Sequence, residues 1–442
     1  MTPLYRRFGA LILIVASLFS STVLGAEKQI APRLTMSEAR AVPPGSGYSR
    51  GPAVAFGGGK YLLVYQDGYH GAGGRSNVRG LFLNARGEPA GGPIDVCAAR
   101  GVQDSPAVAF CAGKFLVSWC DFRSGKDYDL RAALVDPSGK VGNEVLLVGG
   151  PAGQVAPAIA SDGRDTFFVV WQDYRGGLQP RIFGARVSAG DRLIDPEGVK
   201  LLDTGTLPAV AFTDRGFLVQ ANESACLVGP DGEPGEPIKL WARRVNAGAS
   251  VTSAYGKGLV ILNTSPYPDS WGWGGPGAIV GVSVTPEGVS PEMPAMKEGR
   301  FGNAALADRQ VPWVIEAVQW KDHPGWPAGI PGGFLGTQDG TWPSGRTAAA
   351  FNGRGVLVAW TTGNFMDILL LRNRDIYLKR VLDGWHAVDK ASLKVVTGPT
   401  EEANPVLASD GAGGALLAWE RQDPAGGVLV EHAFLHEDAG KK

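Results

Sequence analysis

The sequence has few cysteines, almost no net charge and none of the short motifs of familiar enzymes. Its 442 residues include four cysteines, and their spacing fits no zinc or haem motif. The formal charge of −1 gives no field that attracts nucleic acid or an anionic membrane. The sequence contains no Gly-x-Ser-x-Gly, no His-Glu-x-x-His and no phosphate-binding loop. We therefore expect no nucleic-acid partner and no bound metal, nucleotide or redox cofactor.

The first 26 residues have the pattern of a secretory signal peptide. Arg6 and Arg7 precede an apolar run at residues 10–19, and small residues follow up to Ala26. This run is too short to span a bilayer, although an uncleaved membrane anchor is the alternative interpretation. We expect residues 27–442 to be exported to the periplasm or the extracellular space, without stable insertion into a membrane.

Glycine and proline are abundant, with 64 and 31 residues, which is typical of a chain with many tight turns. Short apolar segments that open with proline or a small residue recur along the chain. The period of about 50 residues is typical of a repeat fold. Eight candidate units begin near residues 51, 105, 156, 207, 250, 304, 346 and 404, and those at 250 and 304 are the weaker copies.

Each well-formed unit predicts four antiparallel strands. Two apolar runs flank a glycine-containing turn, the second run ends on an aromatic residue, and alternating runs follow. The sequence therefore predicts an all-β fold, a single β-propeller of seven or eight blades over residues 27–442. The last unit supplies three strands, so residues 30–37 are expected to close the ring as its fourth.

The stretch SWCDFRSGKDYDL, residues 118–130, joins the second and third strands of one unit and recurs in others. A carboxylate needed once per blade is best interpreted as a turn brace, which caps backbone N–H groups and pairs with the arginine two residues later. Calcium binding by Asp127 and Asp129 is disfavoured, because the EF-hand glycine and final glutamate are missing. The residues assigned to this structural motif are Asp67, Trp119, Asp121, Arg123, Trp171, Asp173 and Arg175.

The pattern W-x-D-x-R, followed by D-[IL] and a D-P-x-G turn, resembles the blade repeat of secreted bacterial β-propeller proteins. In this sequence it reads WCDFR, DL and DPSG, and it is clearest in the units at 105 and 156. The resemblance implies the fold and export. It transfers no catalytic residue, and the sequence also lacks the spacing of a sialidase-type Asp box.

The loops between second and third strands all lie on one face of a propeller, and here they are long and differ between units. Two of them, residues 264–277 and 318–333, are rich in aromatic residues, which suit sugar rings and protein partners alike. The alternative is that these side chains plug the blade ends. The residues assigned to this ligand-binding face are Tyr69, His70, Tyr267, Trp271, Trp273, Trp320, His323 and Trp326.

Two functions fit this face. The first, which we favour, is non-catalytic binding of a glycan or an extracytoplasmic protein. The second is a carbohydrate-active enzyme, a glycoside hydrolase or lyase, for which Asp269, Asp322 and Asp339 are the candidate carboxylates and His323 lies adjacent. We assign no catalytic residue, and a purely structural role in the cell envelope is the third possibility.

One pair of cysteines is expected within reach of a disulfide. Cys97 ends the fourth strand of the first unit, and Cys120 ends the second strand of the next. Both ends lie on the same face of adjacent blades, so a bridge is geometrically allowed.

Overall fold

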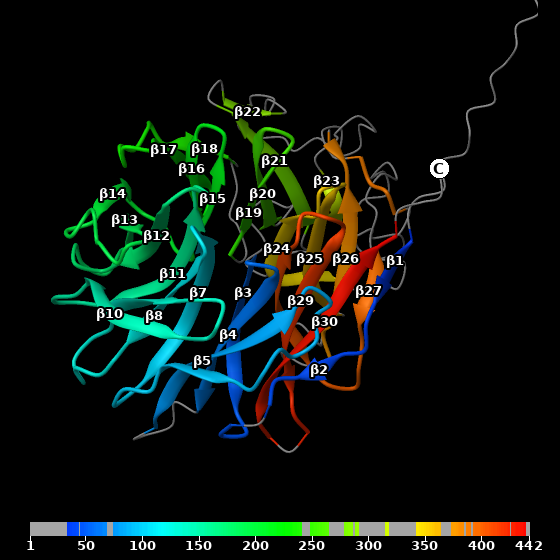
Figure 1. Cartoon of the computed structure of the whole chain (residues 1–442). Helices are drawn as coiled ribbons and strands as arrows, with labels where there is room; N and C mark the ends of the chain where they lie inside the picture. The colour runs from blue at the N-terminus through cyan, green and yellow to red at the C-terminus, as the bar shows by residue number, and fades with distance from the viewer. Residues whose placement is uncertain are drawn as a thin grey trace, which may run out of the picture.

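The computed structural model describes residues 33–43, 45–68, 74–240, 248–264, 278–285, 288–290, 314–317, 342–363, 373–383, 386–389, 392–424 and 426–438. All regular elements in these ranges are β-strands, and they form seven sheets arranged as a ring (Figure 1). The predicted all-β propeller is confirmed, and it has seven blades. No helix within the described ranges is long and apolar enough to cross a membrane. The predicted signal peptide, residues 1–26, lies outside them.

Each blade is a four-stranded antiparallel sheet whose first strand faces the ring axis. Blade one comprises β3 (Ser49–Gly57), β4 (Lys60–Gly68), β5 (Ser76–Asn84) and β6 (Ile94–Cys97). Blade two comprises β7 (Gln103–Cys111), β8 (Lys114–Asp121), β9 (Asp129–Val135) and β10 (Val141–Val148). Blade three comprises β11 (Gln154–Ser161), β12 (Thr166–Asp173), β13 (Arg181–Ser188) and β14 (Val199–Leu202). Blade four comprises β15 (Ala209–Thr213), β16 (Gly216–Ala221), β17 (Ser224–Val228) and β18 (Ile238–Lys239). Blade five comprises β19 (Ser250–Ala254), β20 (Lys257–Thr264), β21 (Ala278–Thr285) and β22 (Gly288–Ser290). Blade six comprises β24 (Trp342–Phe351), β25 (Val356–Gly363), β26 (Asp375–Val381) and β27 (Leu393–Val396), and blade seven comprises β28 (Glu402–Ser409), β29 (Gly414–Gln422), β30 (Val428–Glu437) and β1 (Leu34–Met36).

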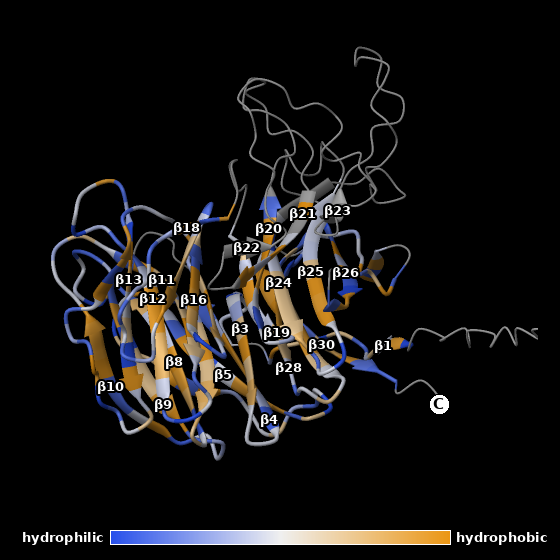
Figure 2. Ribbon diagram, turned by 90° about the horizontal axis from the view of Figure 1, so that it is seen from above, coloured by the Kyte–Doolittle hydropathy of each residue, from blue (hydrophilic) through white to orange (hydrophobic). Residues whose placement is uncertain are grey.

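The hydrophobic core lies between neighbouring sheets rather than at the ring axis. The second strand of each blade is buried on both faces, as in β8, where every residue after Lys114 is buried. Leu62 and Val64 of blade one pack with Val117 and Trp119 of blade two in one such cluster. Figure 2 shows these apolar strands with hydrophilic turns at their ends. A blade therefore buries its apolar faces only when it has a neighbour on each side.

The candidate unit that begins near residue 304 is described in part. Its described strand, β23 (Val314–Ala317), pairs with β21 and so belongs to the sheet of blade five.

Blade seven is completed by the N-terminal strand, as the sequence predicts. Leu34, Thr35 and Met36 of β1 pair with Glu437, His436 and Leu435 of β30, and in Figure 1 the blue β1 lies beside the red β30. A second short strand, β2 (Arg40–Ala41), pairs farther along β30. The first and last described segments of the chain are therefore joined in one sheet.

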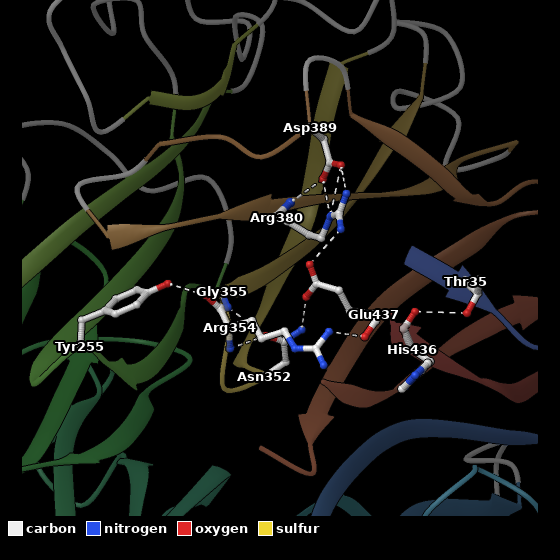
Figure 3. A network of polar contacts seen from close by, with 9 residues as sticks. All are labelled: Thr35, Tyr255, Asn352, Arg354, Gly355, Arg380, Asp389, His436 and Glu437. Carbon is white, nitrogen blue, oxygen red and sulfur yellow. Dashed lines mark hydrogen bonds and ion pairs between the residues drawn. The ribbon is translucent and has the colours of Figure 1, made fainter. Parts of the chain in front are cut away.

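A buried polar network fastens blade seven to blade six (Figure 3). The Glu437 carboxylate accepts hydrogen bonds from Arg380 Nη1 at 2.9 Å and from Asn352 Nδ2 at 2.8 Å. Arg380 also pairs with Asp389, and Arg354 donates to the backbone carbonyl of Glu437. Both partners of the Arg380–Glu437 pair are almost fully buried, so removing either one leaves an uncompensated charge.

Proline at position 35 tests the closure of the ring. Ser37 donates its backbone N–H to the Phe434 carbonyl at 2.8 Å, and because alternate residues of an antiparallel strand face the partner, the N–H of Thr35 also points at β30. We expect Thr35→Pro to lower the free energy of unfolding by about 1–3 kcal/mol, measured by urea denaturation.

The matched control is Met36→Pro, because Met36 directs its N–H away from β30 and is 39% exposed. We expect this variant to lose less than about 1 kcal/mol, since a proline is tolerated where an edge strand makes no ladder bond. Equal losses in the two variants would contradict closure by this strand pair.

Candidate functional site

Five of the seven inner strands carry a two-residue bulge near their first residues. In β7, Ser105 and Pro106 both lie opposite Trp119, which breaks the register between Asp104 and Ala107. The equivalent pairs are Gly51-Pro52, Ala156-Pro157 and Asn404-Pro405, whereas in β24 the register breaks at Gly345-Arg346 and Thr347 pairs with Trp360. Two residues opposite one is the pattern of a β-bulge, which bends the strand and redirects its backbone.

The first residue of each bulge has a positive φ, even where it is not glycine. Ser105, Ala156 and Asn404 have φ of 49°, 54° and 52°, and Leu207, which precedes Pro208 in blade four, has 50°. This conformation costs a non-glycine residue on the order of 1 kcal/mol or more. The same four-fold repetition at the axis indicates that neighbouring structure compensates for the strain.

Contacts between neighbouring blades provide that compensation. The Gly51 N–H donates to Glu420 Oε1 at 2.6 Å, across the junction of blades seven and one. The Leu207 N–H donates to Gln172 Oε1 at 2.7 Å, from blade four to blade three. In both contacts a backbone donor points toward a side chain that directly follows the aromatic residue of the preceding blade's second strand.

The bulges surround a cavity of about 470 Å³ at one end of the ring axis. Because they lie where the inner strands begin, the cavity opens at the end of the blades where second strands lead into third strands. Five pyrrolidine rings form the apolar part of its wall. They belong to Pro52, Pro106, Pro157, Pro208 and Pro405. This volume falls within the range of small-ligand sites.

Three charged residues line the cavity among those that the structure describes: Arg50, Arg346 and Glu420. Arg346 and Thr347 line the cavity where five other blades present an Xaa-Pro pair. The surrounding wall removes part of the hydration of the Arg346 guanidinium and lowers its pKa, and the charge of Glu420 counteracts part of this effect. An arginine remains protonated at any physiological pH, so the cavity contains a fixed positive charge.

Sequence reasoning did not identify these three residues. A signal was present, because the repeated segments open with Gly-Pro, Ser-Pro, Ala-Pro, Leu-Pro and Asn-Pro, whereas the segment at 346 opens with Arg-Thr. An Arg-Thr pair in place of the recurrent Xaa-Pro pair marks the blade that departs from the repeat.

The Asp-Arg motif makes the contacts expected of a turn brace in blades two and three. Asp121 accepts the backbone N–H of Arg123 at 3.0 Å and pairs with its guanidinium at 2.8 and 2.6 Å. It also accepts the indole N–H of Trp119 at 2.9 Å. Burial alone would raise the pKa of Asp121, but these hydrogen bonds bring it below its ordinary value. Trp171, Asp173 and Arg175 repeat the arrangement in blade three.

Asp67 occupies the same position in blade one but binds other partners. Its carboxylate accepts the backbone N–H of Ser46 at 2.9 Å, the Ser46 hydroxyl at 2.7 Å and the Arg79 guanidinium at 3.1 Å. Because Ser46 belongs to the segment that leads from β2 into blade one, Asp67 holds this connection in place.

The residues predicted for the ligand-binding face lie outside the described part of the chain. Their loops, however, are attached at identifiable places. Thr264, Ala278 and Ala317 flank the two aromatic-rich segments, and they are neighbours across β20, β21 and β23. Both segments are therefore attached at the cavity end of blade five.

The cysteines are separate thiols, so the bridge between Cys97 and Cys120 is absent from the structure. The adjacent strand ends are correctly placed, but Cys97 Sγ donates to Glu144 Oε1 at 3.2 Å and accepts a hydrogen bond from Arg123 Nη2 at 3.4 Å. Burial raises the pKa of the Cys97 thiol to about 12, which makes it a poor nucleophile.

Comparison with known proteins gives similarity at the level of the fold. No protein-family model and no curated protein matches this sequence. A protein of unknown function from Dyadobacter fermentans is 10% identical over 92% of this chain and 99% of its own, with a TM-score of 0.49. A neuraminidase-like protein of a little yellow-shouldered bat isolate is 8% identical over 93% and 100%, with a TM-score of 0.42. Trypanosoma rangeli sialidase is 10% identical over 92% and 59%, with a TM-score of 0.41.

The contribution of the brace is tested by Asp121→Ala. This change leaves the buried indole N–H of Trp119 without its acceptor and removes two contacts from Arg123. We expect the free energy of unfolding to fall by about 2–4 kcal/mol in urea denaturation. Asp127→Ala, in the same loop, is the control and is expected to change it by less than about 0.5 kcal/mol. A loss under 1 kcal/mol for Asp121→Ala would rule out a bracing role.

Glu402, at the cavity end of β28, gives a pH-dependent prediction. Burial raises the pKa of its carboxyl from 4.5 to about 7. Between these values the unfolded chain releases a proton that the folded protein keeps, so stability falls as the pH rises. Between pH 5 and pH 8, we expect the free energy of unfolding of Glu402→Gln to fall by roughly 2 kcal/mol less than that of the wild type, measured by urea denaturation. The exposed Glu38→Gln should follow the wild type, and a Glu402→Gln profile parallel to both would refute the shift.

Proposed function

We propose that this protein is an exported, non-catalytic β-propeller that binds a glycan at the cavity end of its ring. The observation that carries the proposal is the axial cavity itself, which combines five pyrrolidine rings with polar groups of Ser105, Ser250 and Asn404. A sugar ring has an apolar C–H face and polar hydroxyl edges, so a wall of alternating apolar and polar groups is complementary to it.

The placement of the aromatic-rich segments supports the same end of the ring. Residues 265–277 and 318–333 are attached at Thr264, Ala278 and Ala317, which lie together at the end of blade five where the cavity opens. Tyrosine and tryptophan side chains from these segments would extend the binding surface beyond the cavity, toward further sugar residues.

Binding without catalysis is favoured by the state of Glu420, the cavity's carboxylate among the described residues. Its two oxygens accept the Gly51 N–H at 2.6 Å and the Asn404 amide at 2.9 Å. Glycoside hydrolysis generally uses two carboxyl groups, one as acid and the other as base or nucleophile. A carboxylate committed to holding two blades together is poorly suited to either role.

The test is incubation of the purified protein with a polysaccharide panel, with retention scored by affinity electrophoresis and hydrolysis by new reducing ends. We expect retention without release, and at least a tenfold weaker retention for the Trp271→Ala/Trp273→Ala double variant. The control is Leu178→Ala, which removes a side chain that is 95% exposed on a blade-three loop.

Release of reducing ends that is lost in Asp269→Asn or Asp322→Asn would overturn the proposal in favour of an enzyme. No retention of any polysaccharide would also overturn it, and would direct the search to a protein partner.

A further inference from the structure

We infer that the axial cavity selects an acidic sugar residue, whose carboxylate or sulfate group binds Arg346 and Arg50. This inference rests on the proposed function and specifies its ligand. It follows from the charges of the cavity, from the position of Arg346 in the repeat, and from the shape of the wall around its guanidinium.

The described cavity wall carries an excess of positive charge. Arg50 and Arg346 stand against Glu420, whose oxygens already accept hydrogen bonds from Gly51 and Asn404. Within the described part of the chain, neither guanidinium has a hydrogen bond or an ion pair to another residue, although both line the cavity. Two fixed cations with unused donors form a site for an anion.

Arg346 is a departure from the repeat that is specific to blade six. Five other blades line the cavity with an uncharged Xaa-Pro pair at the point where blade six has Arg346 and Thr347. The cavity wall removes part of the hydration of the Arg346 guanidinium, while the residue itself stays exposed to solvent and to an incoming ligand. A bound anion would restore the lost interactions, whereas a neutral ligand would desolvate the guanidinium further.

The wall also leaves room for this side chain. A Cβ atom added to Gly248 of blade five would lie 3.3 Å from Arg346 Nε and 3.4 Å from Arg346 Cγ. It would also lie close to Leu207 of blade four. The Arg346 side chain therefore crosses the inner end of blade five and reaches into the cavity. A glycine at this point allows the close approach that alanine would hinder.

The inferred ligand is an acidic sugar because the cavity wall has an apolar part and a positively charged part. The pyrrolidine rings suit the C–H face of a pyranose, and the planar guanidinium binds a carboxylate or sulfate through two parallel hydrogen bonds. The volume of about 470 Å³ suits a short stretch of a chain rather than a folded domain.

The experiment compares tetragalacturonate with its methyl-esterified form, which has the same rings without the charges, by isothermal titration calorimetry. We expect the wild type to bind the acidic form at least tenfold more tightly. Arg346→Gln should weaken binding of the acidic form at least tenfold and leave the ester unchanged, and Arg346→Lys should lose less. Gly248→Ala, which keeps the charge but crowds its path, should weaken the acidic form selectively. Arg164→Gln, the same change at an exposed turn, is the control.

Several outcomes would overturn the inference. Equal affinities for the two forms would do so, as would unchanged affinity in Arg346→Gln. Retention of panel polysaccharides together with no preference for any acidic form, tested also with sulfated oligosaccharides, would refute the acid selection while leaving glycan binding intact. An acidic peptide bound through Arg346 in place of every sugar would refute the sugar and the proposed function together. Folding of each variant is checked by urea denaturation, so that loss of structure is not read as loss of affinity.

Discussion

Closure of the ring is the constraint on which the rest of the structure depends. Each blade buries its two faces against its neighbours, so a ring left open would expose the apolar faces of two blades at once. Glu437 contributes to closure in two ways: its backbone pairs with Leu34 of the N-terminal strand, and its side chain binds Arg380 and Asn352 of blade six. A strand pair and a buried charge network thus meet at one residue.

The same geometry creates the cavity. Five of the seven inner strands bulge where they begin near the axis, and in blades two and three two residues lie opposite one aromatic residue. The strained residues are held by side chains of the preceding blade, such as Glu420 and Gln172. The architectural repeat therefore lines the cavity with prolines from five blades, and blade six departs from this pattern with Arg346.

The parts of this structure that could be predicted from sequence are those whose partners are close along the chain. Strand alternation, the turn glycines and the contacts of Asp121 with Arg123 all lie within a few residues of one another. The closing strand was predictable from counting, since the last unit was one strand short. A short apolar run predicts a strand but not the sheet that it joins, and β23 of the unit at 304 joins the sheet of blade five. Arg50, Arg346 and Glu420 come from three blades, and only their convergence on the axis makes them a site. The cysteine pair shows the remaining limit, because the repeat placed two strand ends side by side but did not determine the contacts of the Cys97 thiol.

The pairing of β1 with β30 also determines the order in which the molecule can be assembled. Thr35 and His436 lie 401 residues apart in sequence, so their contact is among the most non-local in the fold. Contacts of such long range form late, since loop-closure entropy must be offset by structure that already exists. Blades one to six can form as the chain emerges, one hairpin after another, whereas blade seven waits for the last residues. Until then the N-terminal strand has no partner, and the incomplete propeller is an open ring with unpaired backbone groups and exposed apolar faces at its two ends.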